Sequence, residues 1–182
     1  KKNVRNFLSE IASRFYNLKP KNIIAVTGTN GKTSVADMFY QLFRLNNKPV
    51  DSIGTFGIKY NNKFLKTSLT SPDTISLHKT LNFLKKKKIE KVIIEVLSDD
   101  LHQERLHHID FKSAVFTNFS QDHLDYHKNM KAYLNAKLIL FRKILRKKTK
   151  IISDKDILPF KILKKISRKR GLKLVDINNE FL

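Results

Sequence analysis

The chain has no cysteine and no tryptophan, only five glycines and four prolines, and fewer than half as many acidic as basic residues. The absence of cysteine excludes a disulfide scaffold and a thiolate metal site, and it fits a reducing compartment. No apolar run approaches a membrane span, and Lys1-Lys2 leads into an amphipathic stretch, so we expect no signal peptide and predict a cytoplasmic protein. The 182 residues, 41% of them hydrophobic, favour one domain with one sizeable core.

The chain carries a formal charge of +21, from 37 lysines and arginines against 16 acidic residues. A basic surface attracts nucleic acid whatever its sequence, which makes a nucleic-acid binder one alternative. The lysines, however, are scattered over nearly every segment, and the one tight run, Lys85 to Lys88, falls where a helix should end. We therefore interpret the charge as biased composition on solvated faces, and expect neither a nucleic-acid nor a membrane partner.

A short apolar strand runs into a glycine-containing turn and then a helix at residues 23–34. Gly28 and Gly31 allow backbone N–H groups to converge on an anion, and the helix N-terminus adds its positive end. Lys32 can then reach the outer phosphates, and the Thr33 hydroxyl can bind Mg²⁺. The segment therefore predicts a nucleoside triphosphate site. Its ATP-binding residues are expected to be Gly28, Thr29, Asn30, Gly31, Lys32, Thr33 and Ser34.

This loop is shorter than the Walker pattern G-x-x-x-x-G-K-S/T, because Val26 stands five residues before Gly31. By itself, Gly-x-x-Gly-Lys-Thr is also compatible with an ordinary strand-to-helix turn. The following residues, 32–45, carry apolar side chains at helical spacing, as the motif requires. The context therefore favours the phosphate site.

Predicted strands and helices alternate along the chain, which favours an α/β fold with a doubly wound, mostly parallel sheet. Ligands of such sheets bind beyond the carboxyl ends of the strands, and the polar clusters at 28–34, 95–105 and 118–127 follow predicted strands. We expect the fold to be incomplete at its C-terminal end. The predicted helices are 4–18, 32–45, 74–86, 130–145 and 157–170, and the predicted strands are 23–26, 50–53, 56–60, 64–67, 92–96, 114–117, 150–153 and 172–176.

Charged residues in three unusual settings are candidates for chemistry. Glu95 ends an apolar strand, where a carboxylate is costly unless paired, so we expect a cation to face it, either Mg²⁺ or a lysine. Lys137 lies in an apolar helical stretch, where alone it is compatible with a lysine that extends to solvent. Residues 122–127 contain two aspartates and two histidines, which together indicate a metal or phosphate site, although each taken singly fits a cap or a surface group.

Seven short motifs occur in a characteristic order: Thr27 to Ser34, Ile53-Gly54-Thr55, Thr70-Ser71-Pro72-Asp73, Glu95-Val96-x-Ser98, Gln103-x-Arg105, Asp122 to His127, and Tyr133-x-x-Ala136-Lys137-x-x-x-Phe141. In order and spacing they resemble the ATP-binding central domain of the Mur ligases. The similarity is greatest to the branch that adds the third peptide residue to UDP-N-acetylmuramoyl-L-alanyl-D-glutamate. The resemblance is strongest over residues 5–145. It implies a truncated central domain at 21–182, preceded at 1–20 by a linker helix from an N-terminal domain.

The resemblance also implies a reaction, ATP-dependent amide formation in peptidoglycan precursor synthesis. ATP phosphorylates a substrate carboxylate, and the amine of an amino acid then displaces the phosphate. The implied cofactors are ATP and Mg²⁺, and the implied partners are the UDP-N-acetylmuramoyl dipeptide and an amino acid. The protein itself is expected to be a monomer. This chain alone is expected to be inactive, because the domain that selects the amino acid is missing.

The resemblance assigns residue roles at the matching positions. Lys32, Lys137 and His123 are implied to be catalytic, with Lys137 carbamylated. Thr33, Glu95 and His123 are implied metal ligands, and Thr70, Ser71, Ser98, Gln103 and Arg105 are implied contacts of the UDP-sugar peptide.

The sequence departs from this branch after one strand. Members of the branch usually have the sequence Glu-Val-Ser-Ser-His, whereas this chain has Glu95-Val96-Leu97-Ser98-Asp99. Asp100 follows, where a small residue is usual. We expect two carboxylates there to weaken binding of an anionic substrate. Two alternatives stay open, a noncatalytic ATP-binding module and a folylpolyglutamate synthase-like ligase. Thr33, where the latter family tends to carry glycine, together with Gln103 and Arg105, counts against the second.

Overall fold

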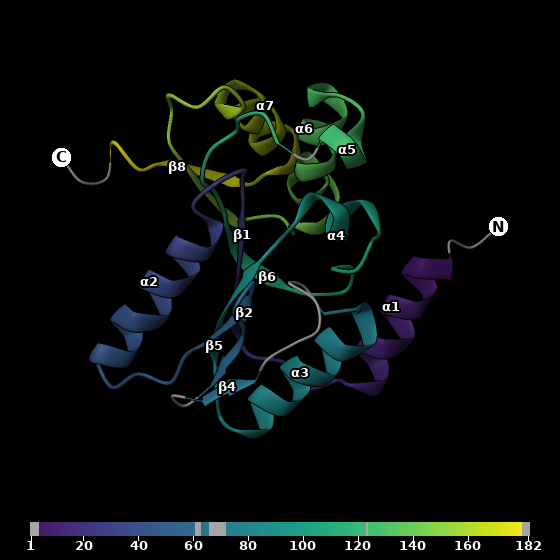
Figure 1. The fold of residues 1–182 in the computed structure, drawn as a ribbon, viewed down its shortest axis with the longest axis vertical. Coiled ribbons are helices and arrows are strands. Elements are labelled where there is room, and N and C mark those ends of the chain that lie inside the picture. The colour runs from purple at the N-terminus through teal and green to yellow at the C-terminus, as the bar shows by residue number, and fades with distance from the viewer. Residues whose placement is uncertain (1–3, 61–62, 66–71, 123, 180–182) are drawn as a thin grey trace.

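The structure is a computed structural model that describes residues 4–60, 63–65, 72–122 and 124–179. Its strands are β1 (Asn22–Thr27), β2 (Asp51–Gly54), β3 (Gly57–Tyr60), β4 (Lys63–Leu65), β5 (Lys91–Glu95), β6 (Phe111–Phe116), β7 (Lys150–Ser153) and β8 (Lys173–Asp176). They form one eight-stranded sheet in the order β4-β3-β2-β5-β1-β6-β7-β8 (Figure 1). The strands from β2 to β8 in this order are parallel, and β3 and β4 add an antiparallel hairpin at one edge. The predicted mostly parallel α/β sheet is confirmed.

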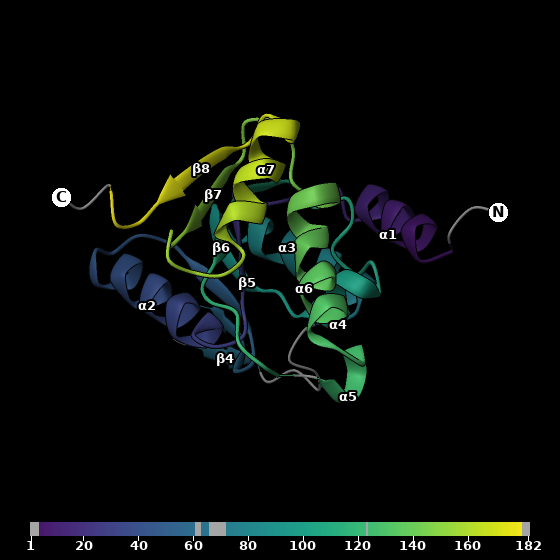
Figure 2. The same ribbon diagram turned by 90° about the horizontal axis from the view of Figure 1, so that it is seen from above.

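Helices cover both faces of the sheet. They are α1 (Val4–Phe15), α2 (Lys32–Leu45), α3 (Thr74–Lys86), α4 (Ser98–His102), α5 (Leu124–His127), α6 (Met130–Ile139), the π-helical turn η1 (Leu140–Ile144) and α7 (Phe160–Arg170). Figure 2 shows α2 on one face and α1, α3 and α6 on the other. Among the described residues, no helix is both long and apolar enough to pass through a bilayer.

The core lies mainly on the face that α3 and α6 cover. Leu77, Leu81 and Leu84 of α3 pack there in a large cluster with side chains of the sheet and of α7. A smaller cluster under α2 contains Ala36 and two strand residues. Because both faces are covered, the central strand β5 is apolar and buried along almost its whole length.

Three predicted helices differ from the structure at their ends. The first ends at Phe15 rather than at residue 18. The predicted helix 130–145 becomes a π-helical turn after Ile139, and the predicted helix 157–170 begins only at Phe160. Pro159 explains the last difference, because proline disfavours helical conformation in the residue before it and is tolerated at a helix start. The short helices α4 and α5 were not predicted, since neither spans enough residues to show a helical period.

The orientation of α1 is unusual for an amphipathic helix. Its small side, with Ser9 and Ala12, is buried, and the Ser9 hydroxyl donates a hydrogen bond to the His107 carbonyl (2.7 Å). The apolar stripe of the helix faces outward instead, and Val4 and Phe15 are each 77% exposed. An apolar stripe left in water indicates a surface that another part of a protein covers.

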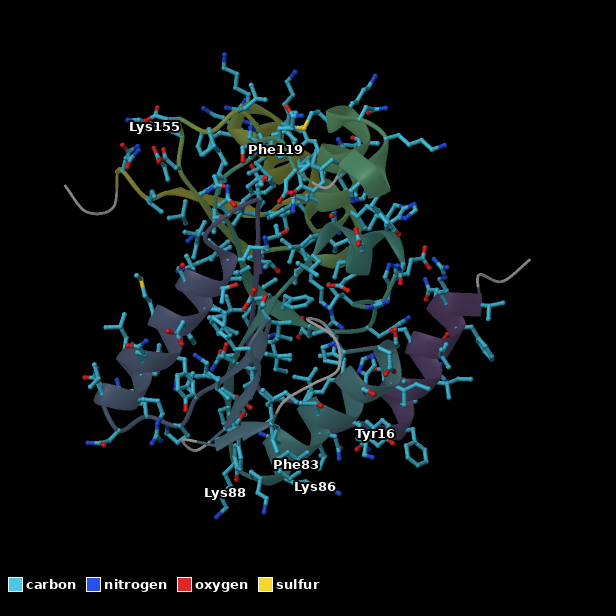
Figure 3. The ribbon with its side chains drawn as sticks, viewed as in Figure 1. Tyr16, Phe83, Lys86, Lys88, Phe119 and Lys155 are labelled. Carbon is cyan, nitrogen blue, oxygen red and sulfur yellow. The ribbon has the colours of Figure 1, made fainter. Side chains whose placement is uncertain are left out.

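Left-handed backbone conformations occur at residues other than glycine. Asn47, Lys88, Glu104 and Lys128 have φ between 54° and 61° just after the ends of α2, α3, α4 and α5. Glycine is the usual residue there, as at Gly171 after α7. The lysine run 85–88 lies at this end of α3 as predicted, and Lys86 and Lys88 extend into solvent (Figure 3).

Candidate functional site

Three polar segments meet at one edge of the sheet, because β1 lies between the parallel strands β5 and β6. The Thr29 N–H donates to the Asn118 carbonyl (3.0 Å), and the Asn30 N–H donates to the Asn118 side-chain oxygen (2.8 Å). On the other side, the Val96 N–H donates to the Val26 carbonyl (2.8 Å). The carboxyl ends of the strands thus bring together the clusters that the sequence separates by many residues.

Residues 28–31, called here the phosphate loop, depend on their two glycines. Gly28 has φ 146°, and a Cβ there would overlap the Thr117 hydroxyl. Gly31 has φ 79° and occupies the N-cap of α2 without offering a capping side chain. The N–H groups of the first turn of α2 are therefore left for an anion, as predicted for a phosphate site.

Lys32 and Ser34 lie in the first turn of α2. The Lys32 ammonium donates to the carbonyls of Gly28 (3.1 Å) and Thr29 (2.6 Å), while Ser34 is exposed. Burial lowers the pKa of Lys32, and the negative charge of Glu95 partly offsets this. Phosphate oxygens are stronger acceptors for an ammonium than neutral carbonyls, so the side chain is held close to where such a ligand would need it.

Glu95 is buried beside the loop, and its hydrogen-bond partners are neutral rather than cationic. Its carboxylate accepts hydrogen bonds from the hydroxyls of Thr33 (2.8 Å) and Thr55 (3.1 Å), and from the Thr55 N–H (3.2 Å). A Cβ on Gly54 would overlap this carboxylate, so glycine is required there. Among the described residues the hydrogen bonds to Glu95 come from these two threonines, and Lys32 acts on it through its charge. A carboxylate with hydroxyl groups is a set of hard oxygen donors that fits Mg²⁺.

Lys137 is buried and does not extend to solvent, which excludes that alternative. Its side chain is 1% exposed, and its amine donates to the Gly28 carbonyl (2.8 Å) from 4.5 Å above the Tyr133 ring. Burial, reinforced by the charge of Lys32, lowers the pKa of Lys137 to about 7 against the opposing effects of Asp122 and Asp99. A substantial fraction of this lysine is therefore neutral near physiological pH.

Tyr133 and Thr55 are two site residues to which the sequence reading gave no role, although both lie in its motifs. The fully buried Tyr133 donates its hydroxyl hydrogen bond to the Thr29 hydroxyl (3.3 Å) and stacks on Phe119. Thr55 bonds Glu95 as described above. Their position in the motifs was the available signal, but only the fold shows what they contact.

The implied substrate contacts lie on and just after α4. Ser98 is buried at its start, and the Arg105 guanidinium donates to the Gln103 side-chain oxygen (2.7 Å) and to Asp100 (3.2 Å). Thr70, Ser71 and His123 lie outside the described residues. The structure thus groups Gln103 with Arg105.

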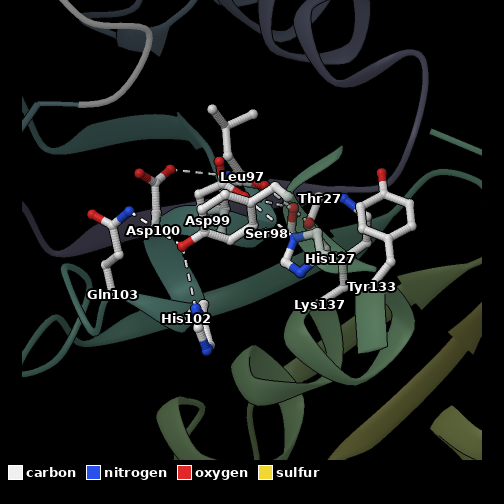
Figure 4. Close-up of polar contacts among 12 residues, drawn as sticks. Thr27, Leu97, Ser98, Asp99, Asp100, His102, Gln103, His127, Tyr133 and Lys137 are labelled. Atoms are coloured by element: carbon white, nitrogen blue, oxygen red, sulfur yellow. Dashed lines mark hydrogen bonds and ion pairs between the residues drawn. The ribbon is translucent and has the colours of Figure 1, made fainter. Parts of the chain in front are cut away.

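The two carboxylates expected to repel an anionic substrate are engaged by the protein (Figure 4). Asp100 is buried, accepts from the Leu97 N–H (3.0 Å) and pairs with Arg105. The Asp99 carboxylate lies 3.2 Å from Nε2 of His127. Burial lowers the pKa of His127, and Asp99 opposes that shift.

Of the aspartates and histidines at 122–127, Asp122 is close enough to the phosphate loop to oppose the lowering of the pKa values of Lys32 and Lys137, and His123 lies outside the described residues. Tyr126 meets His102 (3.2 Å), and His127 meets Asp99. Over the described residues, no three or more histidine, aspartate or glutamate side chains come together as a metal site.

Comparison with known proteins agrees with this geometry. The family model of the Mur ligase middle domain matches residues 26–180. The chain is 42% identical over 167 residues to a UDP-N-acetylmuramoyl-L-alanyl-D-glutamate--2,6-diaminopimelate ligase of Wigglesworthia glossinidia brevipalpis, covering 90% of this chain and 33% of the relative. It is 41% identical over 175 residues to the ligase of the same name from Buchnera aphidicola, and the match covers 95% of this chain and 35% of the relative.

Solved structures show the same fold. A structure of UDP-N-acetylmuramoyl-L-alanyl-D-glutamate--2,6-diaminopimelate ligase has a TM-score of 0.80 and 28% identity, over 94% of this chain and 35% of that chain. A bifunctional folylpolyglutamate synthase/dihydrofolate synthase with Mn, AMPPNP and L-glutamate bound has a TM-score of 0.68 at 18% identity, over 93% and 46%. The chain spans about a third of the length of the curated relatives described above. By the family model and by these relatives, the chain belongs to the Mur ligase family.

Proposed function

We propose that this chain is the ATP-binding part of a ligase that adds an amino acid to UDP-N-acetylmuramoyl-L-alanyl-D-glutamate in peptidoglycan precursor synthesis. The observation that carries the proposal is the convergence of the phosphate loop, Glu95 and Lys137 at one edge of the sheet. The relatives named above support 2,6-diaminopimelate as the amino acid. A role in the cytoplasm, where ATP and UDP-linked precursors are available, and a monomeric state are part of the proposal.

The nucleotide contacts follow from the loop. Backbone N–H groups of residues 28–34 and the Lys32 ammonium would hold the phosphates of ATP. Thr33 and Glu95 would hold Mg²⁺, and the resemblance adds His123 at a second metal position. Bound Mg²⁺ supplies neutralisation of the charge that develops during phosphoryl transfer. The Lys32 ammonium already bonds the carbonyls of this loop, which keeps it beside the proposed phosphate position.

Lys137 is proposed to act as a carbamate. Its neutral amine would attack CO₂, so that an Nζ–C bond forms and one proton leaves the nitrogen. The burial that lowers its pKa to about 7 makes this amine available. The product carries a carboxylate near the carbonyl of Gly28, where it could support a cation. The modification thus gives a purpose to an otherwise costly buried lysine.

The UDP-sugar peptide is proposed to bind along α4, through Ser98, Gln103 and Arg105, with Thr70 and Ser71. Among the described residues, two of the five N–H donors of the Arg105 guanidinium bond protein groups, so the others are proposed to bind the ligand. Its pairing with Asp100 would fix its orientation.

The proposed domain arrangement has residues 1–20 as a linker helix and residues 21–182 as the ATP-binding domain. The outward apolar stripe of α1 supports this division, because contact with a neighbouring domain would cover it. The large share of the relatives that lies beyond the matched region is consistent with further domains.

The proposal is tested with the complete natural protein, by following ADP release that depends on the UDP-muramoyl dipeptide and 2,6-diaminopimelate. We expect Lys137→Ala to abolish this release, and Lys137→Glu or an added short carboxylate to restore part of it. ADP release with a folate substrate and L-glutamate instead would favour the folylpolyglutamate synthase alternative. ATP binding without turnover on either substrate pair would favour a noncatalytic module.

A further inference from the structure

Asp99 and His127 form a carboxylate–imidazole contact, called here the Asp99–His127 pair, between two very short helices beside the phosphate loop. The pair joins α4 to the last residue of α5 at 3.2 Å, with His127 buried and the Asp99 carboxylate 36% exposed. Helices of five and four residues leave most of their backbone groups without helical bonds and are marginal by themselves. Both helices pack on α6, and side-chain contacts between them add to this packing in fixing their positions.

A second contact joins the same two helices. The Tyr126 hydroxyl lies 3.2 Å from Nδ1 of His102 and accepts a hydrogen bond from the Gln103 amide at 3.4 Å (Figure 4). This contact is exposed, whereas the pair described above has a buried histidine.

The contacts continue from His127 to the phosphate loop. The His127 ring centroid lies 5.3 Å from that of Tyr133, and the Tyr133 hydroxyl bonds the Thr29 side chain. The Lys137 amine lies over the same Tyr133 ring and bonds the Gly28 carbonyl. Helix α6 thus touches two consecutive residues of the loop, and His127 packs against the ring between them.

We propose that Asp99 is a positioning residue that holds the phosphate loop in place through His127 and Tyr133. Without the carboxylate 3.2 Å from its Nε2, the buried imidazole can turn away from the Tyr133 ring, which removes support from the Thr29 hydrogen bond. Since α4 also carries Ser98, the contact links the proposed substrate helix to the nucleotide loop. The inference rests on the proposed function only for the identity of the loop's ligand.

The test compares Asp99→Asn with the matched control Asp110→Asn in this chain. The Asp110 carboxylate is also 36% exposed and also pairs with cations, Lys112 at 2.7 Å and Arg146 at 3.4 Å, but it precedes β6 at the opposite edge of the sheet. We expect Asp99→Asn to speed amide hydrogen exchange at Gly28–Asn30 by about three- to tenfold, and to weaken Mg²⁺-ATP binding by a similar factor. The control should change neither quantity by more than about twofold.

A double-mutant cycle distinguishes coupling from general destabilisation. If the path is real, Asp99→Asn and Tyr133→Phe together should speed loop exchange by less than the product of their separate effects. Should Asp99→Asn fail to fold, His127→Gln removes the same Asp99–His127 pair and should speed exchange at Gly28–Asn30 by the same factor.

The inference is overturned if exchange at Gly28–Asn30 stays at the control value while only α5 exchanges faster, because the Asp99–His127 pair would then hold α5 and not the phosphate loop. Equal effects of the two aspartate variants would overturn it as well. A wild-type chain that does not bind Mg²⁺-ATP would refute the proposed function, while the exchange measurement would still decide the role of Asp99.

Discussion

The buried carboxyl group of Asp51 makes the stability of this protein depend on pH in an unusual direction. Asp51 begins β2 and is fully buried. One of its oxygens accepts from the Ser52 N–H (2.7 Å), and the other finds no hydrogen-bond partner among the described residues. Burial raises the pKa of Asp51 from 3.8 to about 8, and the bond from Ser52 opposes this only in part.

The sign of the effect follows from proton binding. Between pH 4 and pH 8 the folded protein keeps the Asp51 proton, whereas the unfolded chain has lost it, so the free energy of unfolding falls as pH rises through this window. Each pH unit in this window lowers the free energy of unfolding by about 1.4 kcal/mol, so Asp51 makes the protein about 4 kcal/mol less stable at pH 7 than at pH 4. In Asp51→Asn this contribution is absent at every pH.

Urea unfolding at several pH values measures the effect. We expect the stability of Asp51→Asn relative to wild type to rise by about 4 kcal/mol from pH 4 to pH 7, whatever constant penalty the buried amide adds. Asp110→Asn, at a partly exposed carboxylate, is the control and should show no such rise. Parallel stability curves for wild type and Asp51→Asn would refute the reasoning and would mean that Asp51 is ionised in the folded protein.

Two further predictions concern the phosphate loop. Lys32→Ala should weaken Mg²⁺-ATP binding by about 1.5–3 kcal/mol, because a charge-assisted contact is lost; calorimetry at low and high salt should give the same difference, and equal affinities of wild type and variant would remove Lys32 from the site. Gly54→Ala should displace the Glu95 carboxylate, which a Cβ would overlap, and should therefore weaken ATP binding in the presence of Mg²⁺ more than ATP binding in EDTA. Titration of Mg²⁺ at a fixed ATP concentration checks this, and an unchanged Mg²⁺ dependence would exclude Glu95 as a ligand.

The sequence predicted the sheet and the phosphate loop well, because both depend on local patterns. The strand, the two glycines and helix 32–45 lie together in the chain, and the structure reproduces that helix at Lys32–Leu45. Partners distant in sequence were not predictable from such patterns. Thr55 meets Glu95 across forty residues, and only the packing of β2 beside β5 places them together.

The orientation of α1 shows a second limit. Its apolar periodicity indicated a helix but not which side would pack, and the buried side proved to be the small one around Ser9. Likewise, the departure of Asp99 and Asp100 from the pattern of the Mur ligase branch led us to expect weaker substrate binding, but it could not show what the two carboxylates contact. The fold instead supplies His127 and Arg105 as partners, from α5 and from the segment after α4.

The left-handed residues that end the helices give this protein an unused reserve of thermal stability. A residue other than glycine in this conformation costs about 1 kcal/mol, and Lys88 and Lys128 lie at such positions without forming any part of the proposed site. Replacing them with glycine relieves backbone strain, and for a domain of this size about 1 kcal/mol corresponds to a few degrees in melting temperature. Glycine substitutions at these two helix ends should therefore give a more thermostable and less basic domain that is better suited to crystallisation with nucleotide.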